Sequence, residues 1–187
     1  MLTSIGWAGR GHNPRIPLRP QTAVPTATPA SPSLSRLYSR PGFLLRRAHQ
    51  IAAAVFEGEC REFALTPAQF GVLTVLSFHP GLGQSSLARA LGFDKVTVLR
   101  VLRGLEARGL VTRTMSPDSK RNISVELSAE GSNVLGKAQK AADKASKRVL
   151  APLDREQQAQ FLSLLQLLTG ALEEDARAAF VPPREVG

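Results

Sequence analysis

The order of short structural patterns from residue 84 to residue 127 constrains the fold more than any other feature of this sequence. QSSLARALGF is typical of a short helix, with Ser85 or Ser86 placed to cap it and Gly92 closing it. Asp94 can cap the helix that follows. When each residue of that second helix is advanced by 100°, one sector collects its large apolar side chains: Val98, Val101, Leu102 and Leu105. Two helices joined by a tight turn are therefore predicted.

A hairpin is predicted directly after Gly109, which ends the second helix. Leu110–Thr114 and Ile123–Leu127 alternate polar and apolar residues as half-buried strands do, and the polar MSPDSKRN between them is the expected tip. Another helix precedes the pair, because Thr66 is a suitable N-cap and Pro67 fits the first helical position. Three short helices and a hairpin predict a mainly α fold with a small β-hairpin wing, a winged helix-turn-helix.

Longer helices are expected on both sides of this core. A first helix is predicted from Arg40 to near Phe63, with apolar residues at steps of three and four: Leu44, Ala48, Ile51, Ala52, Val55 and Phe56. Ser128 is expected to cap a helix that Pro152 interrupts, and Asp154 with Gln157 forms a capping box for the last helix. The last helix carries a heavy apolar stripe: Phe161, Leu164, Leu165, Leu168 and Leu172. Because such a stripe needs a partner, we expect an obligate two-fold dimer rather than a monomer.

These patterns predict the organisation of the chain. Residues 1–36 hold six of the 13 prolines and are predicted to be a disordered tail, either an unstructured extension or an arm that lies along DNA. Residues 37–63 and 128–180 are predicted to be dimerisation helices. Residues 64–127 are predicted to form the winged helix-turn-helix DNA-binding domain.

Composition narrows the classes of partner. The formal net charge of +9 favours a polyanionic partner without proving one. The single cysteine, Cys60, excludes an internal disulfide, and the three histidines form no cluster at metal-ligand spacing, so we expect neither metal nor cofactor. No run approaches the roughly 20 apolar residues that span a bilayer. The start of the chain also lacks a secretory signal, so we expect a cytoplasmic protein without a membrane partner.

The second helix of the pair carries a basic outward face that no acidic residue balances. Its N-terminal residues would meet the major groove of double-stranded DNA. Arg100 can pair with guanine, Thr97 can donate to a phosphate or a base, and Val96 can contact a thymine methyl. An arginine of the wing could enter the minor groove, and serines at a helix N-terminus suit phosphate. The predicted DNA-binding residues are Ser85, Ser86, Lys95, Val96, Thr97, Arg100, Arg103, Lys120 and Arg121.

An isolated pair of arginines on a helix could also be a solvated face with no DNA-binding role. Helix, turn, helix and basic hairpin in this order favour DNA binding, because the combination is far more specific than the charge. The stretch QSSLARALGFDKVTVLRVLRGLEARGLVTRTMSPDSKRNISVELSAEG resembles the central region of MarR-type transcriptional regulators, which have a D-K-[ST]-T-V helix, an L-E-x-R-G-L-V segment and a basic wing. The resemblance covers about residues 40–180.

The resemblance implies a homodimer that binds a short palindromic operator and often releases it when a small molecule binds, commonly a phenol or an aromatic acid. Two features depart from the family pattern. Val96 and Leu99 stand where hydroxyl residues are frequent, and Arg103-Gly104 replaces a frequent Asp-Arg pair. The base preference of the family therefore does not carry over to this chain.

The segment RPGFLLRRAHQ resembles the start of the first helix in the branch of the family near aromatic-catabolism genes. Arg46 and His49 are three residues apart on one helix face and could clamp a carboxylate. Apolar pocket walls would come from Phe43, Phe56 and Phe70. The alternatives are an interchain salt bridge or a snorkelling side chain for the arginine, and a packed surface histidine.

The leading hypothesis is a sequence-specific DNA-binding regulator, most readily a homodimeric repressor released by a small aromatic ligand. Cys60 could be a redox sensor, but the three glutamates around it favour the thiol and a structural role. A lysine stripe is expected to be a solvated face, with contact to flanking phosphates as the alternative: Lys137, Lys140, Lys144 and Lys147. A winged-helix scaffold that binds protein instead of DNA is the competing function. No catalytic order of residues or glycine-rich phosphate loop indicates an enzyme.

Overall fold

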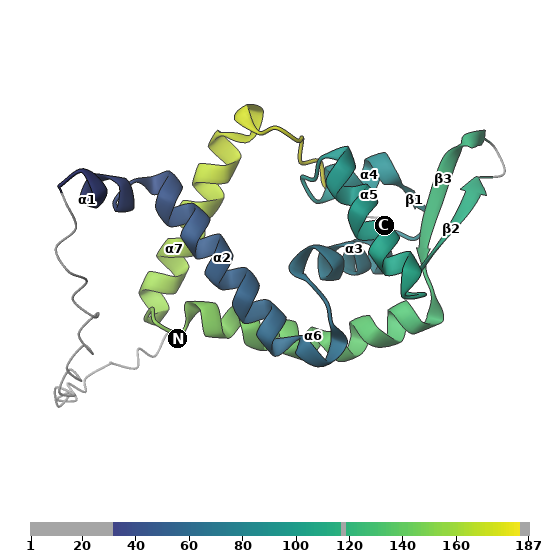
Figure 1. Ribbon diagram of the computed structural model, residues 1–187, viewed down its shortest axis with the longest axis horizontal. Helices are drawn as coiled ribbons and strands as arrows, with labels where there is room; N and C mark the ends of the chain where they lie inside the picture. Colours follow the sequence, from purple (N-terminus) through teal and green to yellow (C-terminus); the bar gives the residue numbers. More distant parts are fainter. Residues whose placement is uncertain (1–31, 117–118, 184–187) are drawn as a thin grey trace, which may run out of the picture. The chain divides into compact units, whose positions relative to one another are not determined.

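The computed structural model describes residues 32–116 and 119–183, with side chains placed for 34–114 and 123–183 (Figure 1). The chain divides into two compact units whose boundary in the sequence falls between Leu44 and Leu45. The winged core and the helices that follow it belong to the same unit, and the predicted division into dimerisation helices and a DNA-binding domain stays a prediction. None of the described helices is long and apolar enough to cross a membrane.

The first described element is a helix that the sequence did not predict. α1 (Pro32–Tyr38) includes the last five residues of the segment predicted to be a disordered tail, so the prediction is wrong for residues 32–36. Pro32 fits the first helical position, where a missing N–H costs nothing, and no other proline follows until Pro41. Residues 1–31 lie outside the described residues. A turn then leads into α2 (Pro41–Glu59).

The second unit has its core between three short helices. These are α3 (Pro67–Phe78), α4 (Gln84–Ala90) and α5 (Lys95–Ala107). All three predicted helices are confirmed. Thr66 caps α3 in a capping box with Gln69, and Pro67 occupies the first position. Each helix contributes fully buried leucines or valines to one cluster: Val72, Leu73, Leu76, Leu87, Val98, Leu102 and Leu105.

The sheet has three antiparallel strands in the order β1-β3-β2. β2 (Val111–Ser116) and β3 (Ser119–Leu127) form the predicted hairpin, with Val111 opposite Leu127. The sequence did not predict β1 (Leu82–Gly83), which pairs with β3. Two residues are too short to show an alternating pattern, and only the folded chain brings them beside β3.

The helices after the wing begin where the sequence predicts. Ser128 caps α6 (Ala129–Leu150) by accepting from the Gly131 N–H, and Asp154 caps α7 (Arg155–Ala171) in a capping box with Gln157. Figure 1 shows α6 starting at the base of the hairpin. A 3₁₀ turn, η2 (Glu173–Asp175), is the last helical element among the described residues.

The long helices leave apolar side chains uncovered within one chain. α7 has no buried residue, and Leu164 and Leu167 are 56% and 68% exposed. Ile51 of α2 is 47% exposed, although the sequence pattern predicted a buried face there. The 3.6-residue pattern shows which side of a helix is apolar, but it does not show whether the covering surface belongs to the same chain.

Candidate nucleic-acid interface

α5 turns one face into the core and the opposite face to solvent. Val98, Leu102 and Leu105 are buried, as the sequence predicts. Asp94 is the N-cap, and its carboxylate accepts from the Thr97 backbone N–H at 2.7 Å. The cap fixes where α5 begins and therefore fixes which side chains its first turn presents.

The outward face of α5 combines positive charge with an exposed apolar side chain. Lys95, Arg100 and Arg103 are exposed, and none of them forms a salt bridge with another described residue. Val96 beside them is 75% exposed. An exposed valine side chain gains no burial energy from water, but it would gain some on contact with an apolar group such as a thymine methyl. The face therefore has both the charge and the apolar contact that a base-reading helix uses.

Thr97 is more constrained than the sequence suggests. Its hydroxyl donates to the Asp94 carboxylate at 3.0 Å, so its proton is already used and its oxygen can only accept in this arrangement. The predicted donation to a phosphate or base would require this bond to break. The Thr97 backbone and side-chain hydrogen bonds hold the pKa of Asp94 below its usual value. The carboxylate thus stays ionised as a cap.

The serines of α4 do not cap that helix. Gly83 is the N-cap and makes no side-chain cap bond, so Ser85 and Ser86 lie inside the first turn and the capping prediction is wrong. Gly83 is the last residue of β1, where it pairs with Ser124 of β3, and α4 begins directly after it at Gln84. Ser85 is exposed and Ser86 is half-buried. A contact of either serine with phosphate stays a prediction.

The wing is attached to α5 by an ion pair that the sequence did not predict. Arg113 of β2 contacts Glu106 of α5 at 2.7 Å. Arg113 and Glu106 lie seven residues apart across the turn after α5, so no helical spacing rule pairs them. Lys120 and Arg121 belong to β3 rather than to a loop tip, and their side chains lie outside the described residues. Their groove contacts remain predictions.

A second unpredicted contact holds the end of α5. The Arg108 guanidinium donates to the backbone carbonyls of Ala64 and Phe63 at 2.8 and 2.7 Å. Ala64 has the left-handed φ of 47° at the end of the 3₁₀ turn η1 (Arg61–Phe63). Arg108 therefore connects the end of α5 to the turn that follows α2.

The predicted ligand residues are only partly brought together. Arg46 and His49 are both exposed on α2. Phe56 and Phe70 pack with ring centroids 5.4 Å apart, which is a usual edge-inclined aromatic contact. Phe43 belongs to the first unit, where its ring lies 5.1 Å from that of Tyr38. A single pocket made by all five residues stays a prediction.

The environment of Cys60 argues against a redox sensor. The side chain is fully buried, and burial together with the negative charge of Glu59 raises the pKa of the thiol. A reactive cysteine needs a lowered pKa and access to solvent. In the described part of the chain no group of three or more histidine, cysteine or acidic residues could hold a metal ion.

Known proteins resemble this chain over most of its described length. The MarR family model matches residues 65–123. The transcriptional repressor Mb2911 of Mycobacterium bovis is 33% identical over 127 residues, which make up 68% of this chain and 91% of that protein. The structure of the transcriptional repressor CouR bound to a 23-mer DNA duplex has 32% identity and a TM-score of 0.66, covering 73% of this chain and 96% of that chain.

One further solved structure concerns a ligand. BpsR of Bordetella bronchiseptica, whose DNA binding is regulated by 6-hydroxynicotinic acid, has 26% identity and a TM-score of 0.66. The match covers 71% of this chain and 94% of that chain.

Proposed function

Because the chain belongs to the MarR family, we propose that it is a homodimeric transcriptional repressor that reads a palindromic operator with α5 of each protomer. The outward face of α5 carries this proposal: Lys95, Arg100 and the 75% exposed Val96 share it, while the opposite face is buried. The wing of each protomer contacts the flanking minor groove through Lys120 and Arg121. The repressor acts in the cytoplasm and catalyses no reaction.

The two protomers join through the uncovered apolar faces of α2 and α7. A stripe as exposed as that of Leu164 and Leu168 is unfavourable in water and becomes favourable when a copy covers it. The spacing of the two copies of α5 then decides whether both fit successive major grooves, about 34 Å apart.

The proposed effector is a small aromatic acid. Support comes from the BpsR neighbour and from Arg46 and His49, which lie one helical turn apart on α2. The ligand favours a spacing of the two recognition helices that no longer matches the operator. Arg46→Ala or His49→Ala would abolish release by the aromatic acid and preserve DNA affinity. A normal response in both variants would remove the two residues from the pocket.

DNA binding is tested by fluorescence anisotropy with a duplex covering the region upstream of the gene, at several salt concentrations. We expect the affinity to fall steeply as salt rises, because bound phosphates release counterions. Arg100→Ala should weaken binding by about tenfold or more, the cost of one bidentate base contact. Arg121→Ala should weaken it without affecting the dimer.

Arg155→Ala is the matched control, because it removes one exposed arginine from α7 instead of from α5. Its affinity should stay close to that of the unmodified protein. If the full chain binds no duplex at any salt concentration, the protein-binding scaffold becomes the better assignment.

A further inference from the structure

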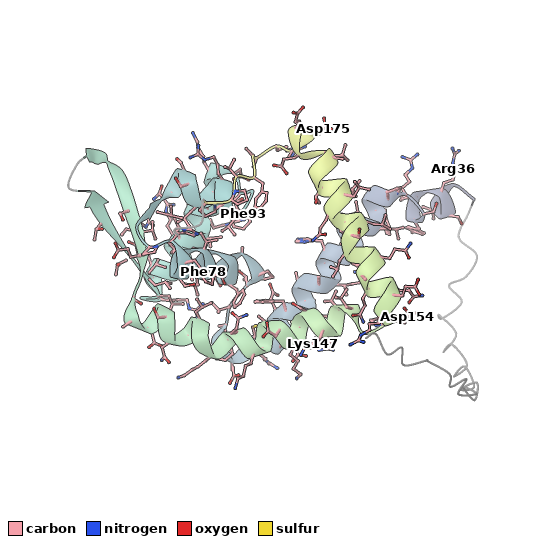
Figure 2. All side chains as sticks on the ribbon, turned by 180° about the vertical axis from the view of Figure 1, so that it is seen from behind. Arg36, Phe78, Phe93, Lys147, Asp154 and Asp175 are labelled. Atoms are coloured by element: carbon pink, nitrogen blue, oxygen red, sulfur yellow. The ribbon has the colours of Figure 1, made fainter. Side chains whose placement is uncertain are left out.

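The chain after α7 returns to the helix-turn-helix pair. Figure 2 shows the segment leaving Asp175 and arriving beside Phe93, which lies in the turn between α4 and α5. The Glu173 carboxylate accepts from the Phe180 backbone N–H at 2.8 Å, and this bond holds the start of the returning segment. Phe180 then lies against the turn, with its Cβ 3.9 Å from the position that a Cβ on Gly92 would occupy.

The segment is attached to α4 by a backbone hydrogen bond. The Val181 N–H donates to the Arg89 carbonyl at 2.8 Å. The Arg89 carbonyl lies in the last turn of α4 and also accepts from the Gly92 N–H at 3.3 Å, so the segment adds a second, shorter hydrogen bond to it. The attachment is shallow, because Phe180 and Val181 remain 50% and 53% exposed.

The residues that follow lie over the solvent side of α4. Val181, Pro182 and Pro183 line a cavity of about 300 Å³ together with Ser86 and Arg89 of α4. His79 and Leu82 complete its wall. Ser86 and Arg89 are three residues apart and share the helix face opposite the buried Leu87. Among the described residues, Arg89 forms no salt bridge and no carboxylate lines the cavity.

The first helix of the pair thus offers a hydroxyl and a guanidinium that has no salt bridge among the described residues. Both groups are of the kind that binds a DNA phosphate. The C-terminal segment lies against the same two side chains. We propose that Ala176–Pro183 is a strap that docks on the Ser86 and Arg89 face of α4 and competes with the DNA backbone for it. This inference rests on the proposed function, because it requires that α4 and α5 approach DNA.

The shallow attachment sets the size of the effect. A competing docked state raises the apparent dissociation constant by the reciprocal of the undocked fraction. A strap docked in about 70 to 90% of free protomers would weaken DNA binding about three- to tenfold per protomer. Because a dimer on a palindrome must release two straps, the weakening of DNA binding applies once for each protomer.

The first test removes the strap. A chain that ends at Ala178 loses Arg184 and Glu185 together, so its net charge does not change and counterion effects stay matched. The probe is an arbitrary duplex of about 30 base pairs at one fixed salt concentration, since backbone phosphates are present in any sequence. We expect the shortened chain to bind at least about threefold more tightly.

A point variant tests the same contact in a full-length chain. Val181→Pro removes the N–H that donates to Arg89 and should also tighten duplex binding. Ala179→Pro is the matched control, because the Ala179 N–H makes no hydrogen bond in the described part of the chain. The control should bind like the unmodified protein.

Amide hydrogen exchange follows the strap directly. The Val181 amide should be protected in the free protein and should exchange faster when saturating duplex displaces the strap. Equal or weaker duplex binding by the shortened chain, or unchanged Val181 protection with duplex, would overturn the strap while leaving the proposed function intact. A full chain without duplex affinity would instead refute the proposed function, and the competition with it.

Discussion

Arg108 acts through contacts between segments that are distant in the sequence. Its guanidinium donates to two backbone carbonyls 44 and 45 residues earlier, at Ala64 and Phe63. The sequence identified Arg108 only as part of an L-E-x-R-G-L-V motif. Asp94, by contrast, was identified correctly as a cap, because an N-cap bonds to a residue three positions later and spacing is sufficient to find it.

Replacing Arg108 with Ala should destabilise the protein. Two hydrogen bonds from a charged donor are lost, and because Arg108 is exposed to solvent they are worth less than buried ones, so we expect a loss of about 1–2 kcal/mol in the free energy of unfolding. Urea denaturation measures the loss. Arg103→Ala, on the outward face of the same helix, should leave the free energy of unfolding nearly unchanged. Equal stability of the two variants would contradict the role of Arg108.

At the scale of elements, the contacts between helices decide the arrangement. Glu59 of α2 accepts from Lys144 and Arg148 of α6, with N–O distances of 2.7 and 2.9 Å. Lys144 of the predicted lysine stripe and the neighbouring Arg148 are therefore paired with α2, although both side chains remain largely exposed to solvent. The lysine spacing along α6 was visible in the sequence, but the partner on α2 was not.

The Glu59 contact should give stability a dependence on acid pH. Hydrogen bonds from Lys144 and Arg148 lower the pKa of Glu59 in the folded chain. A lowered folded pKa means that the stabilisation is present above the ordinary glutamate value of about 4.3 and is lost as the pH falls through the lower folded value. Glu59→Gln should reduce stability near pH 7 and should weaken the dependence of stability on pH in the acid range. If the melting temperatures of the unmodified protein and of Glu59→Gln fell in parallel as the pH is lowered, the contact would be contradicted.

The junction between α5, the wing and α6 leaves no room for a side chain at Gly131. A Cβ there would overlap the carbonyl of Leu110. Gly131→Ala should therefore destabilise the protein by about 1–3 kcal/mol, the usual cost of overpacking. Denaturant titration measures the change.

Gly136→Ala is the control in the same helix. A Cβ at Gly136 meets nothing within 4 Å, so alanine should stabilise α6 by about 0.5–1 kcal/mol. The two substitutions are chemically identical and should have opposite signs. If Gly131→Ala also stabilised the protein, helix propensity and not the junction would govern that site.

At the scale of the whole molecule, the proposed dimer would cover the apolar side chains of α2 and α7 that are exposed in one chain. Leu164→Glu places a charge in the proposed dimer interface and should raise the dimer dissociation constant by about a hundredfold or more, because an unpaired charge is costly to bury. Light scattering coupled to size exclusion reports the mass. The affinity for the operator should fall as the fraction of dimer falls.

Ser163→Glu adds the same charge to the polar side of α7 and should remain dimeric. A dimeric Leu164→Glu variant would contradict the proposed interface. A monomeric unmodified protein would contradict the proposal of a two-fold repressor altogether.

The sequence determined the features that depend on neighbours within a few residues. It predicted the caps at Thr66, Asp94, Ser128 and Asp154, the buried face of α5 and the existence of the hairpin. Caps and helix faces follow fixed spacings, and turns follow from glycine and proline, so one-dimensional patterns contain them.

Only the tertiary structure decided which distant segments meet. The β1 pairing, the Arg113 and Arg108 contacts, the Glu59 contact and the return of the C-terminal segment to α4 all join residues with no regular spacing. Each depends on the path of the folded backbone, which many small packing energies decide together. The sequence therefore predicted which surface could read DNA, while the fold decided what holds that surface and what lies against it.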